Sequence, residues 1–172
     1  MLDLLHTYFS EIPRSRPDRW LRAEQVEYAG RRADFMALDR YESSGCPLHW
    51  VEVKVSRDDW LRELYHPRKA NVFKLGGVDF QWLAVSDPDI VRLDRRELPY
   101  GWGLLVAQDG KLHCVRPPEN YRLSTRGLTV DEVRQARAVR LEVIRSNRWD
   151  RDLVAGFCQA MCRTPGNTGR QH

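Results

Sequence analysis

The sequence predicts an α/β domain, and three observations carry this prediction. The stretch WVEVKVS at residues 50–56 is strand-like, because its acid and its lysine alternate with apolar, mostly β-branched side chains. After it the spacing becomes helical. The apolar face of this helix, which should cover a sheet, is formed by Trp60, Leu61, Leu64 and Tyr65. Further strand-like runs, separated by turn residues, occur on both sides of these two segments.

A helix and two strands are expected before residue 50. Residues 2–10 should form a short amphipathic helix, because their apolar side chains fall on one face and prolines follow them. Residues 20–28 and 31–38 are predicted strands, with a tight turn at Gly30 between them. The segment 39–47 is rich in Ser, Gly and Pro, so it should close a hairpin between the second and third strands.

The helix after the third strand has a clear start. Ser56 followed by Asp59 resembles a capping box, and acids in the first turn favour the positive end of a helix. Pro67 should kink or restart the helix, and Gly76-Gly77 should end it. We therefore expect the chain to return to the sheet after residue 77.

The remaining strands and the C-terminal helices follow in order. Residues 80–85 are a predicted strand, and residues 103–107 and 112–116 a predicted hairpin, because Asp109-Gly110 favours a two-residue turn. Helices are expected at about 129–147 and 150–162 from their apolar spacing. The Gly-, Asn- and Thr-containing tail 165–172 is expected to be disordered.

Composition indicates a globular protein. The chain has 172 residues, of which 42% are hydrophobic and 30% charged, and this length suits one domain with a helical appendage. No apolar run approaches the roughly 18 residues that a membrane helix needs. The first residues lack the basic and apolar regions of a secretory signal, so we expect a cytoplasmic protein without membrane contact.

Arginine dominates the basic residues, and the excess of positive charge lies in the C-terminal third. The net charge is +4, and arginine supplies 24 of the 28 basic residues. Its planar guanidinium suits phosphate, so the C-terminal helices are candidates for holding a nucleic-acid backbone without reading its sequence. The side chains expected to make these contacts are Arg134, Arg137, Arg145 and Arg148. A genome rich in G and C would produce the same bias, and both explanations stay open.

The chemically suggestive residues lie in the second and third strands. Glu52 and Lys54 are two apart, so they project from the same face of their strand. The hairpin should bring Asp34 beside Glu52. Two carboxylates at one strand pair can hold Mg²⁺ with several waters, and a lysine nearby could reach a bound water or a phosphate oxygen. The alternative is an ordinary cross-strand pair on an exposed strand face.

These residues resemble the signature of the PD-(D/E)XK nuclease superfamily, in its MmcB-like DNA-repair and phage branch. Asp34 followed by Glu52-x-Lys54 is similar to the signature, although Ala33 stands where the superfamily name has proline. The similarity covers about residues 20–117. It includes VSRDDWLREL at 55–64, HPRKA at 66–70 and LPYGWGLL at 98–105.

The resemblance implies a fold and a site. The fold is a restriction-endonuclease-like core of helix, three strands, helix and strand within residues 1–118, with an added hairpin and a basic helical extension at 119–164. Asp34 and Glu52 would hold Mg²⁺, with Mn²⁺ as a substitute, and the Val53 carbonyl would add a ligand. Lys54 would position or polarise the attacking water. Further candidates are Glu24, Ser56 and Lys69.

The implied function is a Mg²⁺-dependent DNA endonuclease that hydrolyses phosphodiester bonds in DNA repair, recombination or phage DNA metabolism. One alternative is a non-catalytic DNA-binding accessory protein on the same fold, and another is an RNA-directed nuclease. Cleavage of both strands of a duplex usually needs two active sites, so a homodimer is also an expectation. Nothing in the sequence marks a dimer face.

Overall fold

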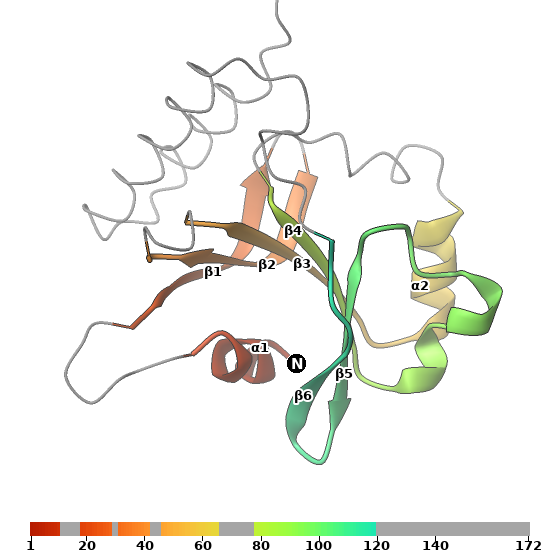
Figure 1. Ribbon diagram of the computed structural model, residues 1–172. Helices are drawn as coiled ribbons and strands as arrows, with labels where there is room; N and C mark the ends of the chain where they lie inside the picture. Colours follow the sequence, from red (N-terminus) through yellow and green to blue (C-terminus); the bar gives the residue numbers. More distant parts are fainter. Residues whose placement is uncertain (11–17, 29–30, 42–45, 66–77, 120–172) are drawn as a thin grey trace, which may run out of the picture.

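The computed structural model describes residues 1–10, 18–28, 31–41, 46–65 and 78–119 (Figure 1). The helices and strands of this part are α1 (Leu2–Tyr8), β1 (Trp20–Tyr28), β2 (Arg31–Asp39), β3 (Leu48–Lys54), α2 (Arg57–Leu64), β4 (Phe80–Val85), β5 (Gly103–Gln108) and β6 (Lys111–Arg116). Two short 3₁₀ turns, η3 (Pro88–Ile90) and η4 (Leu93–Arg95), lie between β4 and β5. The predicted order of helix, three strands, helix and strand is observed up to Val85.

The strands form one mixed sheet of six in the order β1-β2-β3-β4-β5-β6 (Figure 1). Strand β2 runs antiparallel to both β1 and β3, β3, β4 and β5 run parallel to one another, and β6 returns antiparallel to β5. A parallel neighbour needs a crossover, and α2 lies in the crossover from β3 to β4. The described part of the chain is therefore an α/β fold, as the sequence predicts.

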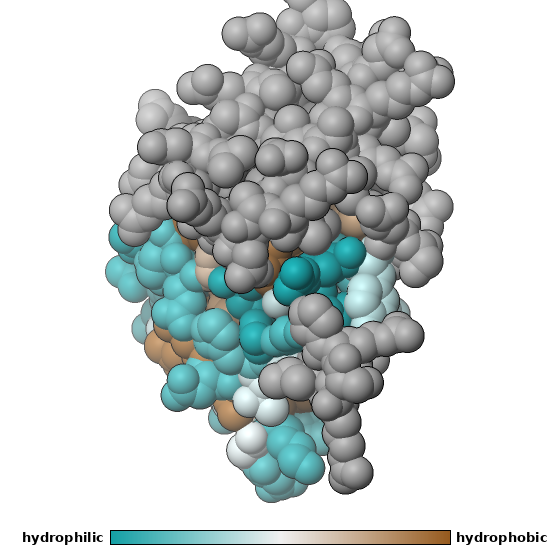
Figure 2. Space-filling model, turned by 90° about the vertical axis from the view of Figure 1, so that its left-hand side faces the viewer, coloured by the Kyte–Doolittle hydropathy of each residue, from teal (hydrophilic) through white to brown (hydrophobic). Residues whose placement is uncertain are grey.

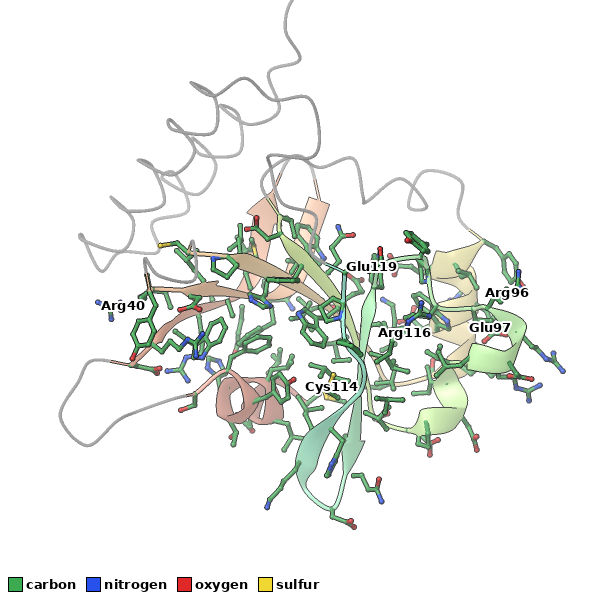
Figure 3. All side chains as sticks on the ribbon, in the orientation of Figure 1. Arg40, Arg96, Glu97, Cys114, Arg116 and Glu119 are labelled. Atoms are coloured by element: carbon green, nitrogen blue, oxygen red, sulfur yellow. The ribbon has the colours of Figure 1, made fainter. Side chains whose placement is uncertain are left out.

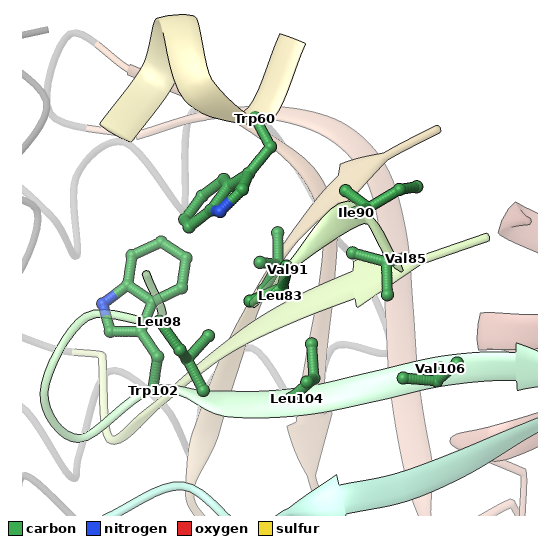
Figure 4. Packing of buried hydrophobic residues seen from close by; sticks show 9 residues of the cluster. All are labelled: Trp60, Leu83, Val85, Ile90, Val91, Leu98, Trp102, Leu104 and Val106. Atoms are coloured by element: carbon green, nitrogen blue, oxygen red, sulfur yellow. The ribbon is translucent and has the colours of Figure 1, made fainter. Parts of the chain in front are cut away.

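One helix covers each face of the sheet (Figure 1). On the α1 face, Leu5 and Phe9 pack with side chains of β2 to β5 in one apolar cluster. On the α2 face, Trp60 packs on a second cluster (Figure 4). Its other members are Leu83, Val85, Ile90, Val91, Leu98, Trp102, Leu104 and Val106. Successive residues of β4 and β5 alternate between the two clusters, as the pleat of a strand requires.

The start of α2 agrees with the predicted cap, and its apolar face agrees in part. The Asp59 backbone N–H donates to the Ser56 hydroxyl oxygen at 3.3 Å, which fixes the helix start. Trp60 is buried and Leu64 packs against the same cluster. The prediction for Tyr65 is wrong, since its side chain is 75% exposed. The helix ends at Leu64, so Tyr65 lies beyond the turns that face the sheet.

An ion pair joins α2 to the crossover between β4 and β5. Arg57, the first residue of α2, donates to both carboxylate oxygens of Glu97 at 2.8 and 2.6 Å, and to the Ile90 carbonyl at 3.0 Å. Glu97 lies in the segment between η4 and β5 (Figure 3). Because the pair is bidentate, it holds the irregular segment between η4 and β5 against the start of α2.

The hairpin of β5 and β6 has the predicted turn. Asp109 and Gly110 connect the strands with φ of 52° and 72°, the left-handed pair that a two-residue hairpin turn needs. At the other end of β5, a Cβ atom at Gly103 would overlap the Trp82 ring and lie 2.9 Å from Pro118. Only glycine therefore fits where β5 enters the sheet.

Several predicted features lie outside the described residues. They are the chain from Pro67 to Gly77, the helices near 129–147 and 150–162, and the tail 165–172. Within the described ranges, no helix has the length and apolar character that crossing a membrane requires. The described residues on the face in Figure 2 are mainly hydrophilic, with apolar side chains in small separate patches.

Candidate functional site

Strands β2 and β3 part at the position of the predicted acid. Their backbone pairing runs from Leu38↔Leu48 to Phe35↔Val51. Beyond it, the Val53 backbone N–H donates to Asp34 Oδ2 at 2.8 Å. The carboxylate therefore satisfies a strand amide that the neighbouring backbone does not. Asp34 is half-buried in this opening.

The three predicted side chains project from the same face of the sheet. Phe35 and Val51 belong to the cluster on the α1 face, and Asp34 and Glu52 are the next residues of the two strands. Because side chains alternate along a strand, both carboxylates project toward α2. Lys54 does so as well, and its side chain is only 7% exposed.

Lys54 contacts acids from both β3 and α2. Its Nζ lies 3.0 Å from Glu52 Oε1, 2.7 Å from Glu63 Oε2 and 3.5 Å from Asp59 Oδ2. Burial alone lowers the pKa of an ammonium, but the hydrogen bonds and charges of Glu63 and Glu52 outweigh it and raise the Lys54 pKa above its ordinary value. Lys54 is therefore a firmly held cation at neutral pH.

The acids near Lys54 outnumber this cation. Burial raises the pKa of Glu52 from its ordinary 4.5 to about 7, and Lys54 opposes the rise. The negative charges of Glu63 and Asp34 raise the Glu52 pKa further. The excess of negative charge around Glu52 and Lys54 favours a further positive charge, either a proton on Glu52 or a bound cation.

Gln25 is a neighbour of the site that sequence reasoning missed. Its Nε2 donates to Asp34 Oδ1 over 3.4 Å, a long hydrogen bond. Gln25 has a φ of 51° within β1, and the pairing of β1 with β2 skips it. Strand periodicity alone assigns no such conformation, so the sequence gives no signal for it.

Glu24 lies away from the two carboxylates. It pairs with Phe35, whose side chain is on the α1 face, and its Oε1 lies 2.8 Å from Nε2 of His6 on α1. His6 also packs edge-on against Phe35, with ring centroids 5.0 Å apart. The structure thus brings Gln25, and not Glu24, from β1 to Asp34.

Glu63 is the second residue that sequence reasoning missed, and a signal for it exists. It follows the buried Trp60 by three residues and Asp59 by four, so it lies on the same side of the helix as these two. A helical projection of residues 57–64 would place it at the edge of the apolar stripe that covers the sheet.

The remaining candidates do not join the site in the described part of the chain. Ser56 serves as the N-cap of α2, and its hydroxyl accepts from a backbone amide. Lys69 lies outside the described residues. The same holds for the four arginines proposed to contact nucleic acid, Arg134, Arg137, Arg145 and Arg148.

The donor atoms available for a metal are all oxygens. Among the described residues, no three His, Cys, Asp or Glu side chains are grouped closely enough to hold a metal ion. Asp34 and Glu52 supply carboxylates, and the Val53 N–H points toward Asp34. The C=O of a strand residue points to the same side as its N–H, so the Val53 carbonyl faces this opening too. Such a sparse oxygen set suits Mg²⁺, which keeps several waters.

Comparisons with known proteins indicate no function for this chain. No protein-family model matches the chain, and no curated protein matches it. The chain is similar to a solved structure described as "SPO1766 protein of unknown function from Silicibacter pomeroyi", with 23% identity and a TM-score of 0.46. The match covers 77% of this chain and 84% of that one.

Proposed function

We propose that the protein is a metal-dependent nuclease that hydrolyses phosphodiester bonds in DNA, in repair, recombination or phage DNA metabolism. One observation carries the proposal: Asp34, Glu52 and Lys54 share one face of the sheet, at the point where β2 and β3 part. The cluster combines oxygen ligands with a fixed cation, the two features that phosphodiester hydrolysis needs.

The order of the elements supports the same proposal. Helix, three strands, helix and strand is the order of the PD-(D/E)XK core, and both acids lie on the second and third strands, as in that signature. The agreement between residue pattern and topology is stronger evidence than either alone. The restriction-endonuclease-like core and the membership of the MmcB-like branch are part of the proposal.

Each side chain has a role that its contacts support. Asp34, Glu52 and the Val53 carbonyl would hold Mg²⁺, or Mn²⁺ in its place. When bound, the ion supplies Lewis acidity and an activated water. Lys54, held charged by its acidic neighbours, would stabilise negative charge on the phosphate or orient the attacking water. The C-terminal arginines would hold the DNA backbone.

A cleavage assay with matched variants tests the proposal. Supercoiled plasmid and labelled nicked, branched and single-stranded DNAs are incubated with Mg²⁺, Mn²⁺ or EDTA. Cleavage should need the metal, and Asp34→Ala and Lys54→Ala should abolish it while DNA affinity stays within a few-fold. Glu24→Ala, which removes an acid from the opposite face, should cleave normally. Undiminished cleavage by Asp34→Ala or Lys54→Ala would refute the proposed site.

A non-catalytic DNA-binding protein is the second candidate, and the ion pairs of Lys54 favour it. Three carboxylates surround this ammonium in the described structure, so the cluster could serve as an internal salt bridge alone. DNA binding without cleavage in either metal would support this candidate. Including RNA in the substrate panel tests the RNA-directed alternative, and sedimentation of the DNA complex tests for a homodimer.

A further inference from the structure

Among the described residues, helix α2 contributes the acid that lies nearest to Lys54. The Glu63 carboxylate is 2.7 Å from the Lys54 ammonium, closer than the carboxylate of Glu52 at 3.0 Å. The Glu63 side chain is 15% exposed, so water screens this contact little. The ammonium is thus shared between a strand that carries the proposed metal ligand and a helix that does not.

The sharing matters because a lysine can compete with a metal ion. Lys54 has a flexible four-carbon stem and projects from the same face as Glu52. If Glu52 and Asp34 were the only acids within reach, the ammonium would neutralise them and occupy the place of a bound cation. An acid on the other side of the ammonium shares its charge and limits this neutralisation.

Helix α2 is well placed to hold Glu63 still. The Ser56 hydroxyl fixes its first turn, and Trp60, three residues before Glu63, is 1% exposed in the core (Figure 4). Groups that orient a functional side chain work best on rigid elements with packed neighbours. A carboxylate on this part of α2 is therefore well placed to hold the long side chain of Lys54 in one position.

We propose that Glu63 is a positioning residue: it holds the Lys54 ammonium between β3 and α2, and so keeps the ammonium from taking the place of a divalent cation at Glu52. This inference rests on the proposed function, because it assumes that Glu52 is a metal ligand. Glu63 acts through Lys54 and is not itself a ligand.

A double-mutant cycle on metal affinity tests the inference. Mn²⁺ binding is measured by calorimetry and by electron paramagnetic resonance for the wild type, Glu63→Gln, Lys54→Met and the double variant. Glu63→Gln should weaken Mn²⁺ binding about tenfold, as is usual for residues that orient the groups around a metal. In the Lys54→Met background the same substitution should change affinity by less than about twofold, because the two act as one unit.

Two further variants separate position from charge. Glu63→Asp keeps the charge but shortens the reach, so it should weaken Mn²⁺ binding as well. Asp59→Asn is the matched control, because it removes a charge from the same helix at a longer contact of 3.5 Å and a more exposed side chain. It should leave the affinity within about twofold. An equal loss in Asp59→Asn and Glu63→Gln would overturn the inference.

The outcomes distinguish this inference from the proposed function. A wild type that binds no Mn²⁺ contradicts both. If Glu63→Gln binds Mn²⁺ as tightly as the wild type does, only the inference is contradicted. If Glu63→Gln weakens Mn²⁺ binding equally in the Lys54→Met background, Glu63 is itself a ligand and the inference is also wrong. The Lys54 ammonium signal in ¹H–¹⁵N NMR gives a readout without metal. This signal should broaden or shift in Glu63→Gln, and an unchanged signal would mean that Glu63 does not hold the Lys54 ammonium.

Discussion

The Asp34 carboxylate accepts the backbone N–H of Val53 across 2.8 Å, at the position where β2 and β3 stop pairing. The side-chain oxygen thus accepts a hydrogen bond that a strand carbonyl would otherwise accept. In the opening between the two strands, the backbone of β3 therefore faces the Asp34 carboxylate. The same contact sets the distance between the acid of one strand and the Glu52-Val53-Lys54 run of the next. The chemistry proposed here depends on this interruption of the sheet.

The contact predicts a difference between two substitutions at Asp34. Asp34→Ala leaves the part-buried Val53 N–H without its acceptor, so the free energy of unfolding should fall by about 1–3 kcal/mol. Asp34→Asn keeps an oxygen that can accept this hydrogen bond, so most of the stability should return while metal binding is lost. Urea unfolding of the three proteins measures the difference, and an Ala variant as stable as the wild type would contradict it.

Glu52 should make stability depend on pH near neutrality. Burial raises its pKa from 4.5 to about 7, with Lys54 opposing. A carboxyl whose pKa is raised by folding stabilises the folded state fully below about pH 4.5, and this contribution is lost as the pH rises through about 7. Glu52→Gln lacks this loss. Its stability relative to the wild type should therefore increase between about pH 5 and pH 8 in urea unfolding without divalent cations.

A bound metal reverses the expectation, which provides the control. A cation at Glu52 favours the carboxylate, so Mg²⁺ should stabilise the wild type at the upper end of this pH range and leave Glu52→Gln almost unaffected. Parallel pH profiles of the two proteins in the absence of metal would mean that the Glu52 carboxyl is not perturbed by its surroundings.

Much of the sheet can be predicted from the sequence, because local rules agree with the global fold there. The alternation around Glu52, the cap at Ser56 and the turn at Asp109-Gly110 each depend on a few adjacent residues, and each occurs as expected. The antiparallel pairing of β2 with β3 also occurs as expected, and its register pairs Phe35 with Val51, the residue after Asp34 with the residue before Glu52.

The strand pattern alone does not predict the rest of the site, because that part depends on the backbone conformation of β1 and on the packing of α2 on the sheet. Regular alternation gives no reason to choose Gln25 over Glu24, and only the positive φ at Gln25 and the pairing of β1 with β2 decide it. Glu63 reaches Lys54 through the packing of α2 on the sheet, which period-two reasoning about β3 does not include. For Tyr65 the apolar spacing predicts a place on the face that covers the sheet, but the helix ends at Leu64 and Tyr65 is exposed.

The conformation of Gln25 predicts a substitution that contradicts strand propensity. Valine is favoured in strands, but a β-branched residue is disfavoured at a φ of 51°. Gln25→Val should therefore destabilise the protein by about 1–2 kcal/mol, whereas Gln25→Gly should stay within about 1 kcal/mol of the wild type. Thermal and urea unfolding measure both.

A neighbouring position of the same strand is the control for Gln25. Ala23 pairs regularly with Met36, so Ala23→Val should change stability by less than about 1 kcal/mol. Gln25→Val as stable as Ala23→Val would argue against the left-handed conformation. A large loss of metal affinity in Gln25→Gly, without a loss of stability, would add Gln25 to the residues that orient Asp34.

The pair of Arg57 and Glu97 should determine how the fold responds to acid. The Arg57 guanidinium, hydrogen-bonded to both oxygens, lowers the pKa of Glu97 from 4.5 to about 2, although burial opposes the shift. A carboxyl with a lowered pKa stabilises the folded state above about pH 4.5, and the contribution is lost as the pH falls through about 2. This window is opposite in sign to that of Glu52, so the two residues can be separated by pH alone.

Glu97→Gln should therefore remove part of the wild-type loss of stability between about pH 4.5 and pH 2, and it should be less stable than the wild type at neutral pH. Asp94→Asn, in the same crossover but exposed, is the control and should follow the wild-type profile. Loss of the ion pair should also loosen the crossover and increase amide hydrogen exchange at residues 92–98. Because Arg57 is the first residue of α2, exchange should increase at the first turn of this helix too. Exchange confined to 92–98, with an unchanged α2, would mean that the ion pair fixes the crossover without supporting the helix that carries Glu63.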